Sequence, residues 1–172
     1  MSSETASKCI IHFPPARAKV RPPSVILYGT IESFSTSNWT THLASTLSDI
    51  PITILNPRRD DWDSSWREDV SFAPFKEQVD WEMDHAAIAD IIVFYFKPGT
   101  QTPITLLELG MYAGLFSKKC IVCCPEGFYK RGNVEIVCGR FGVEFLGSLE
   151  EMEKSIKKRL VELLDVGKGS NA

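Results

Sequence analysis

The chain has 172 residues, of which 44% are hydrophobic and 24% charged, and its mean hydropathy is −0.06. These values are typical of one globular domain and exclude a disordered chain or one made mainly of membrane spans. A formal net charge of −3 at pH 7 gives no general attraction for nucleic acids or anionic membranes. We therefore expect neither a nucleic acid nor a membrane as a partner.

The first 23 residues contain several prolines and lack the continuous apolar core of a signal peptide. We expect residues 1–23 to form a flexible tail and residues 24–167 to form one domain. The chain has five cysteines, an odd number, and three of them lie in one apolar run. That usage suits a reducing compartment, so we expect a cytoplasmic location.

Short apolar runs alternate with helical patterns through the first half of the domain. Residues 24–30 and 52–55 are predicted to form buried strands, with a helix between them that begins near Trp39. A long polar loop with two tryptophans, residues 56–74, precedes a predicted helix over 75–89. We expect the buried side of that helix to carry Phe75, Val79, Met83 and Ala86 or Ala87.

The second half repeats the alternation. Buried strands are predicted over 91–96 and 120–124, with an apolar helix over 103–116 between them. A weaker run at 143–146 predicts an edge strand, and a capped amphipathic helix follows and ends at Gly167. This order predicts a doubly wound α/β sandwich, in which a parallel five-stranded sheet carries helices on both faces.

Ligands of such sheets bind beyond the carboxyl ends of the strands. We expect that edge to hold Gly29, Thr30 and Ile31, the loop 97–102 and the first turns of the helix 103–116.

Glu108 is the only charged residue of the helix 103–116. A helix that is apolar on every side is expected to be buried, and a buried carboxylate is costly unless it is hydrogen-bonded or neutral. Two interpretations stay open: Glu108 pairs with a basic group or a backbone amide, or it is a nucleophile or general acid/base in a pocket. Gly110 and Gly114 would let other backbone approach this helix closely.

Glu82 lies in the predicted helix 75–89, at the edge of its expected apolar side. It is either an ordinary surface acid or a second carboxylate of a site. Two carboxylates suit glycosidic chemistry, in which one attacks the anomeric carbon and the other assists the leaving group.

Several common sites are not indicated. Cys120 and Cys123 have the spacing of a redox or zinc pair, but residues three apart on a strand point to opposite faces, which favours core thiols. The three histidines have no ligand-like spacing, so we expect no metal and no cofactor. The glycine-rich signatures of dinucleotide, P-loop and serine-hydrolase sites are absent from the sequence.

Five stretches together resemble the nucleoside 2-deoxyribosyltransferase family, in particular its fungal-type members. They are "LYGTI", "NPRR", "DWEMDHAAIADIIVFYF", "TPITLLELGMYA" and "KRGNVEIVC", and they lie between residues 25 and 138. The resemblance implies a flavodoxin-like sheet and a covalent reaction at C1′ of a nucleoside sugar. It further implies a homodimer or larger homo-oligomer.

The resemblance assigns roles to individual residues. Glu108 of "ELG" matches the nucleophile, and Glu82 stands where the family usually has an aspartate. Thr102 matches a polar position near the base or phosphate, and Asn133 matches an asparagine donated across a subunit interface. Members that act on nucleotide monophosphates carry a basic residue just after the first strand, where this chain has Glu32.

Arg58, Arg59, Lys97 or Lys130 can replace the missing charge, and the other possibility is a substrate without phosphate. We expect Gly29, Thr30 and Ile31 to approach the ligand through backbone amides. The sequence leaves open whether a base or water accepts the sugar, which would make the protein a transferase or a hydrolase. It also leaves open a non-catalytic module that binds a nucleotide-like ligand on the same fold.

Overall fold

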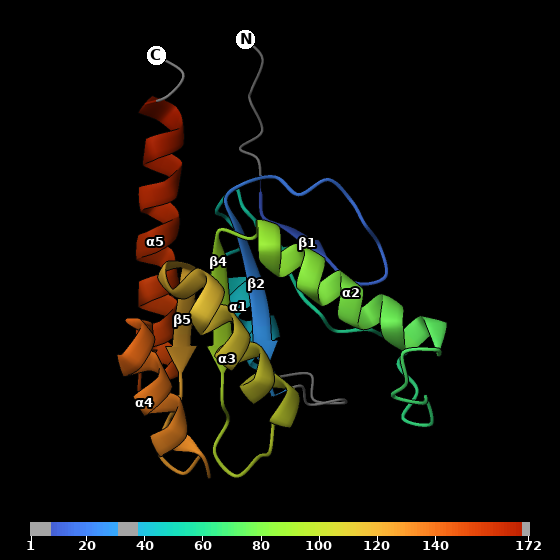
Figure 1. Ribbon diagram of the computed structural model, residues 1–172. Helices are drawn as coiled ribbons and strands as arrows, with labels where there is room; N and C mark the ends of the chain where they lie inside the picture. The colour runs from blue at the N-terminus through green and yellow to red at the C-terminus, as the bar shows by residue number, and fades with distance from the viewer. Residues whose placement is uncertain (1–7, 31–37, 170–172) are drawn as a thin grey trace. The chain divides into compact units, whose positions relative to one another are not determined.

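The computed structural model describes residues 8–30 and 38–169, and it has a parallel six-stranded sheet in the order β1-β3-β2-β4-β5-β6 (Figure 1). The strands are β1 (Ile10–His12), β2 (Ser24–Gly29), β3 (Thr53–Leu55), β4 (Ile91–Tyr95), β5 (Cys120–Cys123) and β6 (Glu144–Leu146). The helices are α1 (Trp39–Thr46), α2 (Ala73–Ile88), α3 (Pro103–Phe116), α4 (Arg131–Phe141) and α5 (Leu149–Gly169), with a 3-10 turn at Ser117–Lys119.

The expected doubly wound α/β sandwich is confirmed, but the expected number of five strands is wrong. The sixth strand, β1, lies inside the segment expected to be a flexible tail and pairs with β3 through Ile10 and Thr53. Sequence patterns miss this strand because it has only three residues and lies close to prolines. Its Ile10 and Ile11 are exposed, so it also lacks the buried apolar run that marks the inner strands.

The chain divides into two compact units, residues 1–27 with 39–90 (unit 1) and residues 28–38 with 91–172 (unit 2). In unit 1, β3 pairs with β1 on one side and with β2 on the other. The buried side of α2 carries Gln78, Trp81, His85 and Ala86.

The expected buried side of α2 is therefore only partly right: Ala86 is buried, but Met83 is exposed and Trp81 is buried instead. The indole N–H of Trp81 donates a hydrogen bond to the carbonyl of Ala16 at 2.8 Å, and its ring contacts that of His85 in a tilted arrangement with centroids 4.0 Å apart. The large surface of an indole outweighs the smaller apolar residues that suggested another side.

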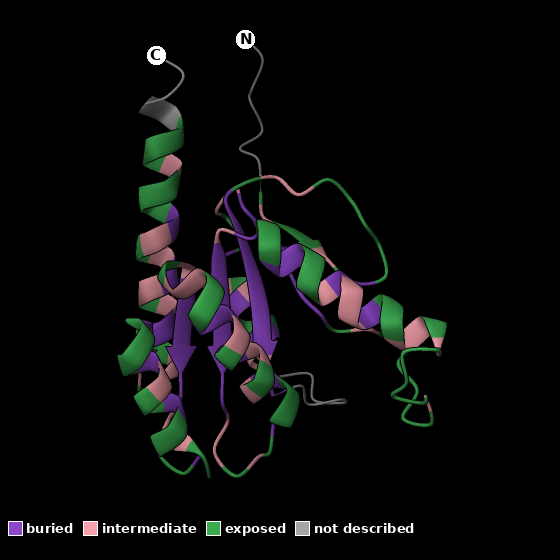
Figure 2. Ribbon diagram, in the orientation of Figure 1, coloured by how far each residue is buried: buried purple, intermediate pink, exposed green. Residues whose placement is uncertain are grey.

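In unit 2, β4 and β5 are buried along their whole length (Figure 2). Helices α3 and α4 pack against each other on one face of these strands, and α5 packs on β5 from the other face (Figure 1). No helix was expected at α4, which ends at Phe141 and is capped by Gly142 in a left-handed conformation with φ +68°. The expected end of the last helix is also wrong, because α5 continues past Gly167 to Gly169.

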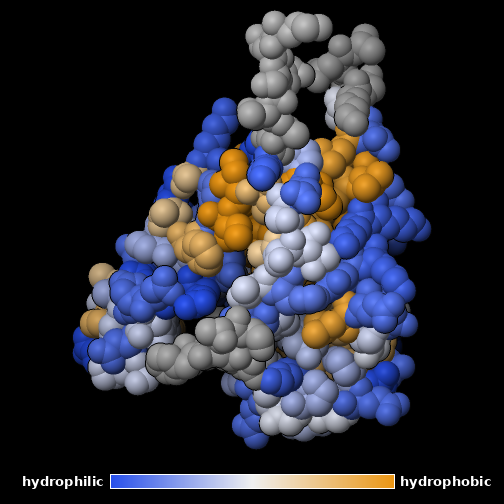
Figure 3. Space-filling view, turned by 180° about the vertical axis from the view of Figure 1, so that it is seen from behind, coloured by the Kyte–Doolittle hydropathy of each residue, from blue (hydrophilic) through white to orange (hydrophobic). Residues whose placement is uncertain are grey.

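The surface mixes hydrophilic side chains with separate hydrophobic patches, as the view from behind shows (Figure 3). Single exposed apolar residues are ordinary on folded proteins. Among the residues that the structure describes, no helix is long and apolar enough to cross a membrane.

Replacing Gly29 with alanine is expected to destabilise the fold by about 2–4 kcal/mol. A Cβ atom at this position would lie 2.3 Å from the carbonyl oxygen of Tyr95, and the φ of +149° is unfavourable for any residue with a side chain. Urea unfolding of the variant measures the loss. The matched control is Gly139→Ala in α4, where no atom lies within 4 Å of the added methyl group and helix propensity favours alanine. Equal stability of the two variants would contradict this interpretation.

Candidate functional site

The carboxyl end of β2 meets the end of β4 within unit 2. The backbone N–H of Thr30 donates to the carbonyl of Tyr95 at 3.2 Å, directly after the close approach of Gly29 to the same residue. Thr30 itself is buried. The strand ends are therefore joined by backbone contacts that leave no room for a side chain at position 29.

A chain of hydrogen bonds links Thr30 to the loop after β4. The hydroxyl of Thr100 donates to the carbonyl of Lys97 at 2.8 Å, and the hydroxyls of Thr30 and Thr100 are 3.0 Å apart. Because Thr100 has only one hydroxyl proton, Thr30 is the donor between them. The N–H of Lys97 in turn donates to the Thr30 hydroxyl at 3.4 Å. The expected meeting of Thr30 with the loop 97–102 is confirmed, whereas Ile31 and Glu32 lie outside the described residues.

Thr102 stands at the N-cap position of α3, directly after this loop. Its carbonyl accepts the first hydrogen bond of the helix, from Leu106 at 3.0 Å, but its side chain caps no backbone amide. The hydroxyl oxygen is buried and has no hydrogen-bond partner within the described parts of the chain. An unsatisfied buried hydroxyl is costly, and the N-terminus of a helix favours anionic or polar ligands.

Glu108 lies on α3 and is half-buried. The expectation that this apolar helix is buried on every side is wrong. Only one side is buried, and Ile104, Leu107 and Leu115 are 61%, 69% and 65% exposed. The carboxylate is therefore at the border between the covered side of α3 and an exposed apolar side.

Two glycines of α3, Gly110 and Gly114, have open space where a side chain would begin. Nothing within 4 Å would meet a methyl group at either position. The close approach of other backbone, expected from these two glycines, does not occur within the described residues of the chain.

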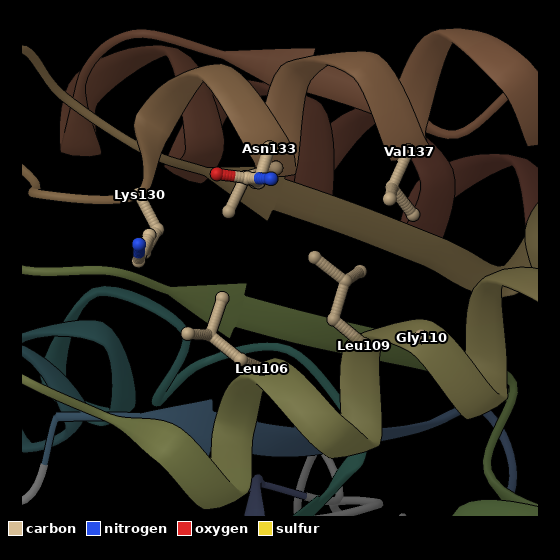
Figure 4. A pocket seen from close by; sticks show the side chains of 7 residues that line it. Leu106, Leu109, Gly110, Lys130, Asn133 and Val137 are labelled. Atoms are coloured by element: carbon tan, nitrogen blue, oxygen red, sulfur yellow. The ribbon is translucent and has the colours of Figure 1, made fainter.

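A hollow of about 280 Å³ lies between α3 and α4 (Figure 4). Its walls are mainly apolar, with Lys130 and Asn133 as the polar residues. The remaining lining residues are Leu106, Leu109, Gly110, Val134 and Val137. Asn133 is exposed on α4 and borders this hollow.

Within one chain, the side chain of Glu108 does not face Asn133 of α4. Leu106 and Gly110, each two residues from Glu108, line the hollow that Asn133 borders. Two residues along a helix correspond to a turn of about 200°. Glu108 therefore points away from the hollow, and the structure does not bring these two predicted site residues together within one chain.

Glu82 is half-buried on α2 in unit 1, where it has a partner that the sequence analysis missed. The side-chain amide of Gln78 donates to Oε1 of Glu82 at 2.7 Å and to the carbonyl of Pro57 at 2.8 Å. The spacing of four residues between Gln78 and Glu82 places both on one side of a helix, and this spacing could have indicated the contact.

The two arginines after β3 differ in their partners. Arg58 is exposed, pairs with Asp60 at 3.2 Å, and donates its backbone N–H to the side chain of Asn56. The side chain of Arg59 is only 7% exposed and pairs with Asp61 and Glu77. Of the two, Arg58 is the one with a side chain exposed to an anionic ligand.

The tryptophans of the loop after β3 pack on each other. The rings of Trp62 and Trp66 are 5.1 Å apart, and the guanidinium of Arg59 lies 5.0 Å from the centre of the Trp66 ring. Trp66 also contacts Phe72. These contacts hold the loop together from within.

The four cysteines of unit 2 are buried free thiols. Burial raises the pKa of Cys120 and Cys124 to about 11 and that of Cys123 and Cys138 to about 12. Thiols with such pKa values are poor nucleophiles and poor metal ligands at neutral pH. No cluster of three or more metal-ligating side chains occurs in residues 8–30 and 38–169.

The family model described as "Nucleoside 2-deoxyribosyltransferase like" matches residues 22–128. The chain belongs to this nucleoside 2-deoxyribosyltransferase-like family, which supports a role in nucleoside glycosyl transfer at the level of the family. The match includes Glu82, Thr102 and Glu108, whereas Asn133 lies beyond its end.

Among solved structures, the chain is similar to one titled "Crystal structure of conserved protein from Enterococcus faecalis V583". The identity is 13%, the TM-score is 0.51, and the alignment covers 80% of this chain and 99% of that one. At this identity the likeness concerns the fold alone. The comparison with curated proteins gives no match.

The free energy of unfolding is expected to fall as the pH rises from 9 towards 12. The ordinary thiol pKa is 9.0, so in this range the unfolded chain releases protons that the four buried thiols of the folded chain still hold. Urea unfolding at several pH values measures the slope. Cys138→Ala removes one of these thiols and should reduce the slope, and an unchanged slope would contradict the assignment.

Proposed function

We propose that the protein cleaves the N-glycosidic bond of nucleosides or nucleotides, with Glu108 as the nucleophile. The observation that carries this proposal is the family match over the "ELG" segment of α3, in which Glu108 is the only charge of an otherwise uncharged helix. A carboxylate at the border of the buried side has less water around it than a fully exposed acid, which favours attack on an electrophilic carbon.

The proposed reaction is a double displacement. The Glu108 carboxylate forms a bond to C1′ while the bond from C1′ to the base nitrogen breaks, and Glu82 gives a proton to that nitrogen. A glutamyl-sugar ester results. Attack at C1′ by a second base or by water then releases Glu108, and exclusion of water favours the transferase outcome.

The strand ends of unit 2 are proposed to hold the ligand. The backbone at positions 29–31 can approach a ligand closely because Gly29 has no side chain. The buried hydroxyl of Thr102, which lacks a partner within the described chain, gains one from a sugar hydroxyl or phosphate at the N-terminus of α3. Arg58 is proposed as the basic residue for a phosphate, if the substrate carries one.

Purified protein is expected to release or exchange bases when it is incubated with ribo- and deoxyribonucleosides and their monophosphates. Glu108→Gln should lose at least about 10³-fold in rate, because the amide cannot form the sugar ester. Chromatography with and without a free acceptor base separates transferase from hydrolase activity. Glu126→Gln, an exposed acid in the loop after β5, is the control.

Turnover by wild type that survives in Glu108→Gln would exclude Glu108 as the nucleophile. Ligand binding without turnover by either protein would instead favour the non-catalytic module. That module is the second candidate because membership of a family does not fix catalysis.

A homo-oligomer is proposed to form through the exposed side of α3. Ile104, Leu107, Met111 and Leu115 follow one another at helical spacing, and open space adjoins Gly110 and Gly114. In an isologous contact, the same surface of both copies takes part. The apolar side chains of one copy would then pack against the glycines of the other, and the reverse. Asn133 is proposed to reach the site from the other copy, because Glu108 and Asn133 of one chain lie on different sides of α3.

Sedimentation velocity is expected to show a dimer or larger species for wild type and a monomer for Leu107→Glu. A carboxylate in the centre of an apolar contact remains unpaired and is costly. The control is Val161→Glu on α5, at a position that is 52% exposed on the other face of the strands of unit 2. A monomeric wild type, or equal effects of both variants, would exclude this interface.

A further inference from the structure

Gln78 is a buried polar residue in the middle of α2, with a relative exposure of 6%. Its side-chain nitrogen donates to the carbonyl oxygen of Pro57 at 2.8 Å and to Oε1 of Glu82 at 2.7 Å. Pro57 lies two residues after the end of β3. The amide therefore connects the backbone at the end of β3 with the carboxylate of Glu82.

The orientation of the amide follows from its two partners. A peptide carbonyl can only accept a hydrogen bond, so the nitrogen of Gln78 and not its oxygen must face Pro57. The same nitrogen supplies the second N–H to Glu82. Rotation of the amide by 180° would place its oxygen against the Pro57 carbonyl and break both contacts.

The other end of the amide is not satisfied. Oε1 of Gln78 is buried and has no hydrogen-bond partner within the described part of the chain. A buried acceptor without a partner costs about 1–3 kcal/mol, which an apolar residue of the same length would avoid. Packing alone would thus favour methionine at this position, and what glutamine adds is the pair of N–H donors.

We propose that Gln78 is a positioning residue for Glu82, which holds the carboxyl group in the orientation needed to protonate the leaving base. The inference rests on the proposed function. Gln78 occupies Oε1 of Glu82, so the proton that Glu82 donates is carried on Oε2. The proton moves from Oε2 to the base nitrogen, and the electron pair of the broken glycosidic bond stays on that nitrogen.

The bond from Gln78 also limits rotation of the Glu82 side chain. A glutamate has three side-chain torsions, and a displacement of about 1 Å from the productive geometry can lower a rate about 10²-fold. Because Pro57 holds the amide from the other side, the restraint on Glu82 comes from the segment after β3 and not only from α2.

The test is a double-mutant cycle with Gln78→Met, Glu82→Gln and the double variant. Gln78→Met preserves length and removes both N–H groups. We expect kcat to fall about 10–100-fold in this variant while KM changes by no more than about twofold. The double variant should be no slower than Glu82→Gln alone, because Gln78 acts only through Glu82.

A second substrate separates positioning from damage to the fold. A nucleoside of a 7-methylated purine releases a neutral base without protonation, so its cleavage does not need the acid. Gln78→Met should cleave it at nearly the rate of wild type, whereas Glu108→Gln should fail on both substrates. Lys76→Met, which removes an exposed contact with Asp80 on the same helix, is the matched control and should behave as wild type on both.

Two results would overturn the role of Gln78 while leaving the proposed function intact. One is a double variant whose loss of rate is the product of the two single losses, and the other is an equal loss of rate for Gln78→Met on both substrates. An unchanged rate in Glu82→Gln would overturn it as well, because no acid would then need positioning. If the wild-type protein turned over neither substrate, the proposed function would be contradicted, and the role of Gln78 would fall with it.

Discussion

The contact between the backbone of Gly29 and the carbonyl of Tyr95 is the constraint on which the candidate site of unit 2 depends. A side chain at position 29 would occupy the space of that carbonyl, so β2 can end beside β4 only with glycine there. The hydrogen bond from Thr30 to Tyr95 follows directly, and the hydroxyl network through Thr100 follows from that. The polar groups before α3 are thus placed by backbone geometry and not by long flexible side chains, which reduces the entropy lost when a ligand binds.

The two carboxylates proposed for catalysis are held in different ways. Glu108 is placed by its position on α3, at the border between a buried and an exposed apolar side. Glu82 is placed by a neighbour, because Gln78 anchors its Oε1 to the backbone after β3. A nucleophile needs an unhindered path to carbon, whereas an acid needs a defined direction for its proton. In the proposed reaction, the hydrogen bond from Gln78 supplies such a direction for Glu82.

Much of this structure could be predicted from the sequence, because buried parallel strands appear as continuous apolar runs. The strands at 24–29, 91–95 and 120–123 were predictable for that reason. Prediction failed where a segment is short or where one large residue decides the packing. β1 has three partly exposed residues, and Trp81 turns α2 away from the side that its smaller apolar residues suggested. Glu82 and Glu108 were proposed as site residues from spacing, composition and the family resemblance. Gln78 was not, because its proposed role depends on the Pro57 carbonyl, a contact between residues 21 positions apart.

Both outermost strands of the sheet are short. The outermost strands in the order, β1 and β6, have three residues each, whereas the central strands β2 and β4 have six and five, and β3 and β5 have three and four. A strand at the edge of a sheet exposes unpaired backbone donors and acceptors to which other chains can add. With only three residues at each edge, few such groups are available in a row. The sheet therefore combines buried central strands with edges that are poor templates for aggregation.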